Sequence, residues 1–170
     1  MSDGTTLLVS YQHGHHASVV ADHAKRTAES AASFFLPFLE PGMRLLDIGC
    51  GPGSITSGLA QRVAPADTIG IDPSSSVIET ARSLAGGMAH LTFEVGDIYR
   101  PRFGAETFDG IFAHQVLQHL HRPVEALKQA RTLLKCGGIV GVRDVDWGST
   151  TFYPDNQGMR RFHLTLQPGQ

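Results

Sequence analysis

The fold is decided at residues 45–53, which read L-L-D-I-G-C-G-P-G. An apolar run typical of a buried strand is followed at once by Gly49, Gly51 and Gly53. Glycine lets the backbone turn sharply and approach a ligand without interference from a Cβ atom. Where such a loop opens a helix, free backbone N–H groups and the helix dipole face the bound molecule. This stretch therefore predicts a ligand-binding loop, with the carboxylate of Asp47 near the end of the strand.

Composition limits what this loop can belong to. The chain has 170 residues, of which 41% are hydrophobic and 18% charged, and this is typical of one soluble globular domain. The 14 basic and 16 acidic residues give a net charge of -2 without a basic run. There is thus no electrostatic reason to expect nucleic-acid binding, and a small-molecule ligand fits better.

Targeting signals are not evident in the sequence. No apolar stretch approaches the roughly 20 residues that cross a bilayer. The N-terminus, M-S-D-G-T-T-L-L, lacks the basic region and long apolar segment of a secretory signal. We therefore expect no membrane span and a cytoplasmic location.

The two cysteines are too few for a disulfide framework. Cys50 follows one predicted strand and Cys136 precedes another, so in a parallel sheet they lie at opposite ends, roughly 15 Å apart at about 3.3 Å per residue. They are not expected to form a disulfide. Nothing near Cys50 in sequence would lower the pKa of its thiol, which favours a packing role over a nucleophilic one.

Strands and helices alternate along the chain. After the strand that precedes Gly49, further strands are predicted at residues 68–72, 91–95, 108–113 and 139–144. This alternation predicts an α/β fold: a doubly wound, mostly parallel sheet with right-handed crossovers and helices on both faces.

Three helices are predicted between these strands. In the first, apolar residues repeat from Ile55 until Pro65 stops the pattern. The second opens after Pro73, with the capping-box spacing of Ser76 and Glu79, and ends at residues 86–87, which are glycines. In the third, Pro123 sets the first turn and two glycines at 137–138 close the helix. Its predicted buried face comprises Leu127, Ala130, the stem of Arg131, and Leu134.

Three regions are predicted along the chain. Residues 1–40 form an N-terminal helical cap, largely helical over 18–39 and interrupted by Pro37. Residues 41–148 form the core, and 149–170 a C-terminal extension. No linker separates the cap from the core, so we expect it to brace the core rather than to form a domain.

Three carboxylates fall at predicted strand ends: Asp47, Asp72 and Asp97. In an open parallel sheet the ligand lies beyond these carboxyl ends. Asp72 follows the glycine loop by about 20 residues, the distance at which an acidic side chain accepts hydrogen bonds from ribose hydroxyls. Asp97, one strand further on, is placed to accept from the amine of a purine. These positions indicate an adenine nucleoside.

Two cofactor classes contain such a nucleoside. A dinucleotide requires G-x-G-x-x-G, because its pyrophosphate sits on the helix N-terminus and the third glycine allows close helix packing. Here the pattern is G-x-G-x-G, with Ser54 in place of that third glycine. S-adenosylmethionine (SAM) has no phosphate but has a cationic sulfonium and an amino-acid tail, so it favours nearby carboxylates such as Asp47.

At this point the sequence resembles class I SAM-dependent methyltransferases, specifically the ubiquinone and menaquinone biosynthesis group. The matching motifs are L-L-D-I-G-C-G-P-G-S, G-I-D-P-S, V-G-D-I, F-D-G-I-F-A-H-Q-V-L-Q-H-L and L-L-K-C-G-G-I-V-G-V-R-D, which span about residues 42–144 in the family's order. The leader S-Y-Q-H-G-H-H-A-S-V-V-A-D-H also resembles the N-terminal cap of a subgroup.

The resemblance implies a role for each matching residue. Gly49 and Gly51 would pack against the methionine part of SAM, with Asp47 near its amino group. Asp72 would bind the ribose, while Asp97 and the backbone of Ile98 would read the adenine. His114 and Gln115 would line the sulfonium end. The residues expected to contact SAM are Asp47, Gly49, Cys50, Gly51, Asp72, Pro73, Asp97, Ile98, His114 and Gln115.

The C-terminal region departs from the family. Complete members continue through two further strands, one of them antiparallel, whereas this chain ends at Gln170. The last strands are therefore expected to be lacking, and the strand at 139–144 would have an open edge. We expect a fragment, an alternative product, or a chain that forms a homo-oligomer through that edge.

The histidines leave several interpretations open. The motif H-x-H-H at residues 13–16, with His23, has no local cysteine or carboxylate to complete a tetrahedral site, so no metal is predicted. His119 and His121 are either a general base or hydrogen-bonding residues that fix a turn. Arg26 and Tyr11 either contact substrate or lie on a solvated face.

The expected activity is transfer of the methyl group of SAM to a small organic acceptor by in-line displacement. Because the sulfonium is a good leaving group, such catalysis needs mainly alignment and exclusion of water. The sequence accordingly predicts the cofactor and assigns no catalytic residue. Two alternatives stay open: a catalytically inactive SAM-binding module or truncated product that acts through a partner, and an NAD-dependent oxidoreductase.

Overall fold

The computed structural model describes residues 26–146 and 158, and its body is a five-stranded sheet in the order β3-β2-β1-β4-β5. Every neighbouring pair of these strands is parallel. The strands are β1 (Leu45–Ile48), β2 (Thr68–Asp72), β3 (Leu91–Val95), β4 (Phe108–His114) and β5 (Leu134–Arg143). The predicted α/β fold with a doubly wound parallel sheet is confirmed.

The strand order reverses at β1. From β1 the chain moves outward through β2 to β3, then returns to the other side of β1 to form β4 and β5. Ligands of open parallel sheets bind beyond the carboxyl ends of the strands at such a switch point. The fold therefore directs attention to the ends of β1 and β4, where Ile48 and Ala113 lie side by side.

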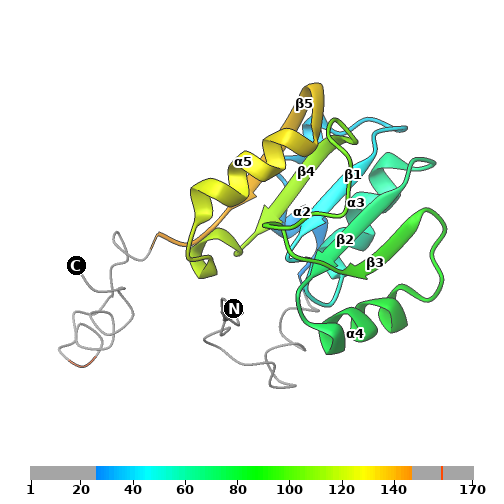
Figure 1. Ribbon diagram of the computed structural model, residues 1–170. Helices are drawn as coiled ribbons and strands as arrows, with labels where there is room; N and C mark the ends of the chain where they lie inside the picture. The colour runs from blue at the N-terminus through cyan, green and yellow to red at the C-terminus, as the bar shows by residue number, and fades with distance from the viewer. Residues whose placement is uncertain (1–25, 147–157, 159–170) are drawn as a thin grey trace, which may run out of the picture.

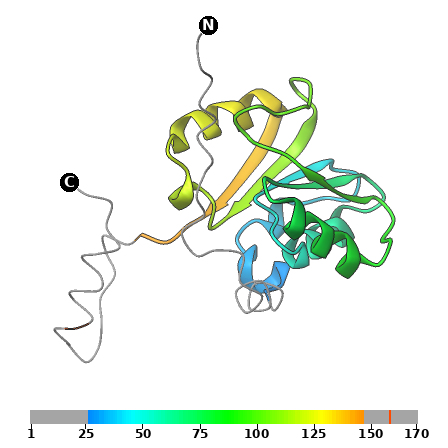
Figure 2. The ribbon, with the colours of Figure 1, turned by 60° about the horizontal axis from the view of Figure 1, so that its bottom comes forward.

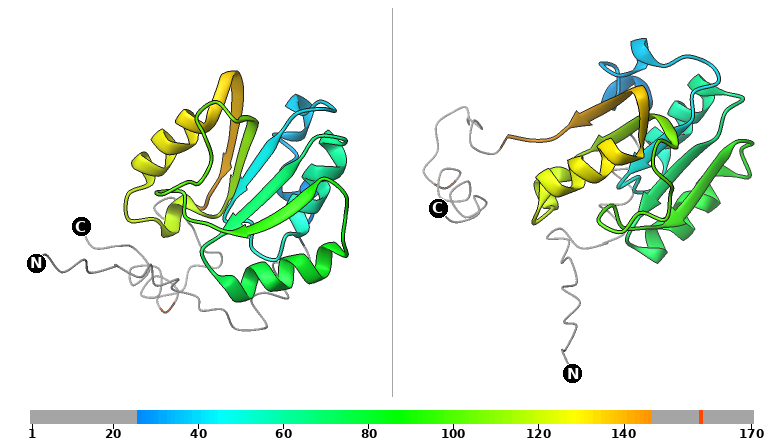
Figure 3. Two further views of the ribbon diagram at one scale, coloured as in Figure 1. Left: turned by 45° about the vertical axis from the view of Figure 1, so that its right-hand side comes forward. Right: turned by 45° about the horizontal axis from the view of Figure 1, so that its top comes forward.

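Helices cover both faces of the sheet. On one face, α5 (Pro123–Leu133) packs over β4 and β5 (Figure 1), and its Ala126 and Ala130 share a cluster with Leu46 and Ile111. On the other face lie α3 (Ser54–Val63) and α4 (Ser75–Ala85). The right-hand view of Figure 3 shows β5 running between α5 and the N-terminal segment.

The N-terminal segment is less helical than predicted. Within the described residues it contains only α2 (Ala28–Ala31) and the 3-10 helix η1 (Leu36–Phe38), while residues 18–25 lie outside them. Pro37 lacks a backbone N–H and sits in the first turn of η1, which explains why a continuous helix does not form. Phe35 is nevertheless buried against the sheet residue Phe112, with ring centroids 5.5 Å apart. The described part of the cap thus shares a core with the sheet. Figure 2 shows the cap segment in blue, and α2 contacts α3.

Helix α4 opens after Pro73 as predicted, but the predicted capping box of Ser76 and Glu79 does not form. Its N-cap is Ser74, without a side-chain capping bond, and Ser76 lies inside the helix. Asp72 Oδ1 accepts a hydrogen bond from the Ser74 N–H at 3.0 Å, which turns the chain early and displaces the predicted capping box. The end of α4 is as predicted, because Gly86 is its C-cap with φ +58°.

The predicted boundary between α5 and β5 is also wrong. The helix ends at Leu133 and the strand begins at the next residue, so the glycines at 137–138 lie within β5. Pairing with β4 decides this boundary, because Leu134 pairs with Phe108 and the register then shifts before Gly110.

The buried face of α5 accordingly differs from the predicted one. It comprises Ala126, Ala130 and Leu133, so only Ala130 was placed correctly as a buried residue. Leu127 is 39% exposed, Arg131 is exposed, and Leu134 belongs to β5.

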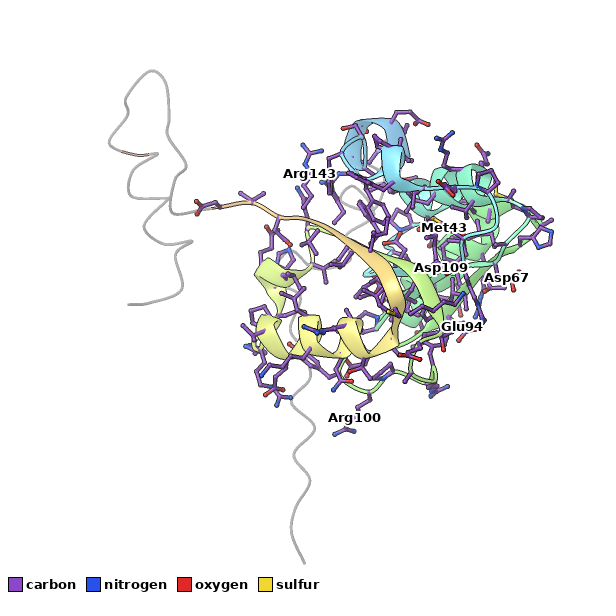
Figure 4. All side chains as sticks on the ribbon, turned by 90° about the horizontal axis from the view of Figure 1, so that it is seen from above. Met43, Asp67, Glu94, Arg100, Asp109 and Arg143 are labelled. Carbon is purple, nitrogen blue, oxygen red and sulfur yellow. The ribbon has the colours of Figure 1, made fainter. Side chains whose placement is uncertain are left out.

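Polar contacts join the elements at both ends of the sheet. Figure 4 labels two of the residues that make them, Asp109 and Arg143. At the amino ends, Asp109 accepts from the Arg44 N–H at 2.8 Å and from Lys135 Nζ at 2.9 Å. At the carboxyl end of β5, Arg143 Nη1 donates to the Ser30 carbonyl at 2.9 Å. The bonds of Lys135 and Arg143 hold the edge strand β5 against its neighbours, and the Arg44 bond joins β4 to the residue before β1.

Both cysteines are free, as predicted, with Cys50 buried and Cys136 exposed. Within the residues that the structure describes, no helix is long and apolar enough to cross a bilayer.

Candidate ligand-binding site

The glycine loop is folded onto the end of β2. The N–H groups of Gly49 and Cys50 both donate to the Ile71 carbonyl, at 2.8 and 3.0 Å. Gly49, Gly51 and Gly53 have φ values of +67°, +55° and +81°, which residues with a Cβ atom rarely adopt. Gly53 is the N-cap of α3, so the loop ends where the helix N–H groups are free. The predicted order of strand, glycine loop and helix is confirmed.

The three glycines have different surroundings. A Cβ atom on Gly49 would lie 2.5 Å from Val116 Cγ2, and one on Gly53 would lie 2.4 Å from the ring of Phe93. A Cβ atom on Gly51 would have nothing within 4 Å. Gly49 and Gly53 are thus required by packing inside the protein, whereas Gly51 borders open space that a ligand can enter.

Asp47 lies in β1 and is 3% exposed. Its Oδ2 accepts a hydrogen bond from Thr56 Oγ1 of α3 at 2.6 Å. Burial raises the pKa of Asp47 to about 7, with the nearby negative charge of Asp72 adding to the increase and the Thr56 bond opposing it. A buried carboxylate with this pKa favours a cationic group beside it. Sequence reasoning missed Thr56, because only the packing of α3 on the sheet brings it to Asp47.

Asp72 ends β2 and connects the two loops that follow β1 and β2. Its Oδ2 accepts from the Gly51 N–H at 3.3 Å and its Oδ1 from the Ser74 N–H at 3.0 Å. Each carboxylate oxygen has two lone pairs, so an oxygen that accepts from a backbone N–H can also accept from a ligand hydroxyl. Pro73 is exposed beside it.

Cys50 packs in a small cluster with Ile78, Ala81 and Phe93. Burial raises the pKa of its thiol well above the ordinary value, and the negative charges of Asp47 and Asp72 raise it further. The thiolate is therefore strongly disfavoured, which agrees with the predicted packing role.

Asp97 and Ile98 follow β3. Asp97 is exposed, and its Oδ1 accepts from the Tyr99 N–H at 2.9 Å, the bond of an Asx turn. Ile98 is 4% exposed and its side chain belongs to the main core cluster. The side chain of Asp97 therefore fixes the turn after β3 and places the backbone of Ile98.

His114 and Gln115 lie at the end of β4. The ring of His114 stacks on Phe112 with centroids 6.5 Å apart. Gln115 has φ +56°, and its N–H donates to the Arg143 carbonyl at 2.7 Å. This bond extends the contact between β4 and β5 beyond the sheet and sets the direction of the segment that carries Val116.

His119 lies in the 3-10 helix η2 (Leu117–His119), with its Nε2 3.0 Å from Gln118 Nε2. Gln118 Oε1 in turn accepts from the Val145 N–H at 3.0 Å. These contacts favour the interpretation in which His119 fixes the turn. His121 is exposed. Sequence reasoning missed Gln118, whose partner Val145 is distant in sequence.

The structure thus brings together the carboxylates of Asp47 and Asp72 and the glycine loop, with Asp97 one strand further along the sheet. Among residues 26–146 and 158, no group of three His, Cys, Asp or Glu side chains is placed to hold a metal ion. Arg26 is half-buried. Outside the described residues lie Tyr11, His13, His15, His16 and His23.

The chain is similar to known proteins over most of its length. The family profile described as "Methyltransferase domain" matches residues 39–161. An uncharacterized methyltransferase of Schizosaccharomyces pombe is 34% identical over 152 residues, which are 85% of this chain and 55% of the relative. A "probable methyltransferase" of Aspergillus luteorubrus is also 34% identical, over 89% of this chain and 56% of the relative. The chain spans about half the length of these curated relatives.

Solved structures share the fold. A SAM-dependent methyltransferase from Aquifex aeolicus superposes with a TM-score of 0.70 at 17% identity, covering 87% of this chain and 85% of that one. The [4+2]-cyclase SpnF superposes with a TM-score of 0.58 at 29% identity, covering 74% of this chain and 43% of that one. The similarity to the Aquifex aeolicus protein concerns the fold alone. The similarity to SpnF shows that a protein named as a cyclase has the same fold.

Proposed function

Because this chain belongs to the methyltransferase-domain family, we propose that it binds SAM at its glycine loop and transfers the methyl group to a small organic acceptor. The observation that carries the proposal is that a buried carboxylate, Asp47, precedes a glycine loop in which a Cβ atom on Gly51 would meet nothing within 4 Å. The core at residues 41–148 would contain the site, braced by the N-terminal cap.

The residues present fit SAM. Its ammonium group would stabilise the ionised form of Asp47, which burial otherwise disfavours. Its ribose hydroxyls would donate to Asp72, and Asp97 with the Ile98 backbone would accept from and donate to the adenine. Gly51 would let the backbone approach the methionine part. Cys50 and Pro73 would border the cofactor without polar contacts, and His114 and Gln115 would lie at its sulfonium end.

The role of the protein in the reaction is alignment. When bound, SAM supplies an electrophilic methyl group with a good leaving group behind it. The chain's own residues then hold the cofactor, orient the acceptor in line with the methyl group and exclude water. A small organic acceptor is favoured over nucleic acid, because the net charge is -2 and the sequence contains no basic run.

A SAM-binding protein without methyl transfer is the second candidate. The chain is 29% identical to a [4+2]-cyclase that shares its fold, and the stated activity of that protein is not methyl transfer. This similarity supports the second candidate. An NAD-dependent oxidoreductase is the weakest candidate, since Ser54 begins α3 where a dinucleotide fingerprint needs glycine and the family match is to methyltransferases.

We also propose that β5 offers an interface for a second copy of the chain. It is an edge strand of the described sheet, and Val140 on it is 49% exposed. Exposed apolar edge strands are normally covered by a partner or by further chain.

Calorimetric titration with SAM, S-adenosylhomocysteine and NAD tests the cofactor proposal. SAM and S-adenosylhomocysteine should bind and NAD should not. Asp72→Ala should weaken SAM binding by about 1–3 kcal/mol, the range for leaving buried polar groups unpaired. Asp67→Ala is the matched control, because Asp67 is an exposed carboxylate at the opposite end of β2 and should leave affinity unchanged.

Equal affinity in the two variants would remove Asp72 from the site. A methyl-transfer assay with a panel of small acceptors then separates the two main candidates. SAM binding without transfer to any acceptor would favour the non-methylating protein.

A further inference from the structure

The side chain of Gln118 joins the segment after β4 to the residues that follow β5. Gln118 Oε1 accepts from the Val145 N–H at 3.0 Å, and the Gln118 N–H lies 3.4 Å from Asp144 Oδ1. Gln118 Nε2 is 3.0 Å from Nε2 of the neighbouring His119. One side chain therefore contacts both the backbone beyond β5 and an imidazole ring at the carboxyl edge of the sheet.

The backbone of Val145 fixes which way this amide points. A backbone N–H can only donate, so the atom of Gln118 that faces it must be the oxygen. The opposite orientation would place the amide NH₂ group against the Val145 N–H, donor against donor. The NH₂ group of Gln118 must therefore face His119.

The same reasoning extends to the ring. An amide NH₂ group is a donor only, so Nε2 of His119 must accept and cannot carry a proton while the contact exists. A neutral imidazole has one protonated nitrogen, which is then Nδ1.

We propose that Gln118 is a positioning residue that holds His119 neutral, with the proton on Nδ1 and the lone pair of Nε2 directed at the Gln118 amide. The importance of this for methyl transfer rests on the proposed function, whereas the tautomer itself does not. In this arrangement Nε2 does not remove a proton from the methyl acceptor. His119 instead stays a neutral ring that is fixed against Gln118 at the end of η2.

Among residues 26–146, charged or titratable groups flank η2 on three sides. Asp144 follows β5 and contacts the backbone of Gln118. At the start of α5, Arg122 Nη1 and Glu125 Oε2 lie 2.8 Å apart and offset each other. His121 is exposed in the connection between η2 and α5. The contact of the Gln118 amide with Nε2 of His119 remains the observation on which the tautomer rests.

The test uses the full chain labelled with ¹⁵N. Long-range ¹H–¹⁵N spectra report which ring nitrogen of each histidine carries the proton, and loss of one ring in His119→Gln assigns the His119 signals. In the wild type without ligand, Nε2 should be the unprotonated nitrogen. In Gln118→Glu a carboxylate faces the ring, so the proton should move to Nε2 and the pKa of His119 should rise by about 1 unit or more.

Gln61→Glu is the matched control, because Gln61 is exposed on α3 and the variant adds the same charge away from η2. It should leave the tautomer and the pKa of His119 unchanged. A wild-type His119 ring protonated at Nε2 would overturn the proposal. A Gln118→Glu variant in which His119 keeps the tautomer and the pKa of the wild type would also overturn it. If Gln118→Glu does not fold, the wild-type tautomer alone decides.

The pH dependence of methyl transfer gives a readout that a merely structural role would not move. The neutral ring of His119 is the form that orients its surroundings, and Gln118→Glu keeps the ring charged up to a higher pH. The pH profile of this variant should therefore shift toward higher pH, and that of Gln61→Glu should not. A SAM titration of the wild type keeps the two proposals apart. Failure to bind SAM would refute the proposed function while leaving the tautomer as measured.

Discussion

Gly49 and Gly51 lie two residues apart in the same loop, yet replacing each with alanine should have a different effect. Both have positive φ, at +67° and +55°. A methyl group on Gly49 would meet Val116 Cγ2 at 2.5 Å, whereas one on Gly51 would meet nothing within 4 Å. Gly49→Ala should therefore destabilise the folded protein, and Gly51→Ala should mainly obstruct the ligand.

The structure sets the size of the difference. A left-handed backbone costs a residue with a Cβ atom roughly 1–2 kcal/mol, and both variants incur this cost. Overpacking a filled site costs about 1–3 kcal/mol more, and only Gly49→Ala incurs it. We thus expect the free energy of unfolding of Gly49→Ala to lie about 1–3 kcal/mol below that of Gly51→Ala.

Urea unfolding without ligand measures this difference, and calorimetry with S-adenosylhomocysteine measures affinity. Adding Val116→Ala to Gly49→Ala should restore part of the stability, because it removes the methyl groups that clash. Equal destabilisation by the two glycine variants, or no recovery in the double variant, would refute the steric argument. Normal affinity in Gly51→Ala would refute the assignment of the open side to the ligand.

Two further predictions concern stability. Because burial raises the pKa of Asp47 to about 7 from 3.8, the folded state holds this proton more tightly and unfolding releases it. The resulting stabilisation is complete below about pH 4 and is lost as the pH rises to about 7, so the free energy of unfolding should fall by on the order of 4 kcal/mol across this range. Asp47→Asn should remove this pH dependence from the free energy measured by urea unfolding. An unchanged pH dependence in the variant would contradict the assignment. A Cβ atom on Gly58 of α3 would lie 2.6 Å from the Ala28 Cβ atom of α2, so Gly58→Ala should lower the midpoint of thermal unfolding by the equivalent of about 1–3 kcal/mol. Ala28→Gly in the same chain should recover part of the loss, and its failure to do so would argue against this contact.

The sequence predicted strands well where local signals are strong. The bounds of β2 and β3 match the predicted residues 68–72 and 91–95, because each is a short β-rich run that ends at a glycine or a carboxylate. The end of α4 also matched, since Gly86 adopts the left-handed conformation that terminates helices.

Predictions failed where a distant strand or side chain decides. The end of α5 was predicted at the glycines of residues 137–138 and the next strand at residue 139. Pairing of Leu134 with Phe108 instead begins β5 at Leu134, five residues before the predicted start. The capping box of α4 failed because Asp72, which precedes the helix, holds Ser74 in place. Neither outcome can be read from local periodicity.

The sequence by itself determined the parallel sheet, the glycine loop and the carboxylates at the strand ends, because these depend on hydrophobic periodicity and on the backbone freedom of glycine, which are local. Only the tertiary structure decided that Thr56 binds Asp47, that Val116 fills the space beside Gly49, and that Gln118 joins Val145 to His119. These contacts form between segments that only folding brings together, so no spacing along the chain encodes them.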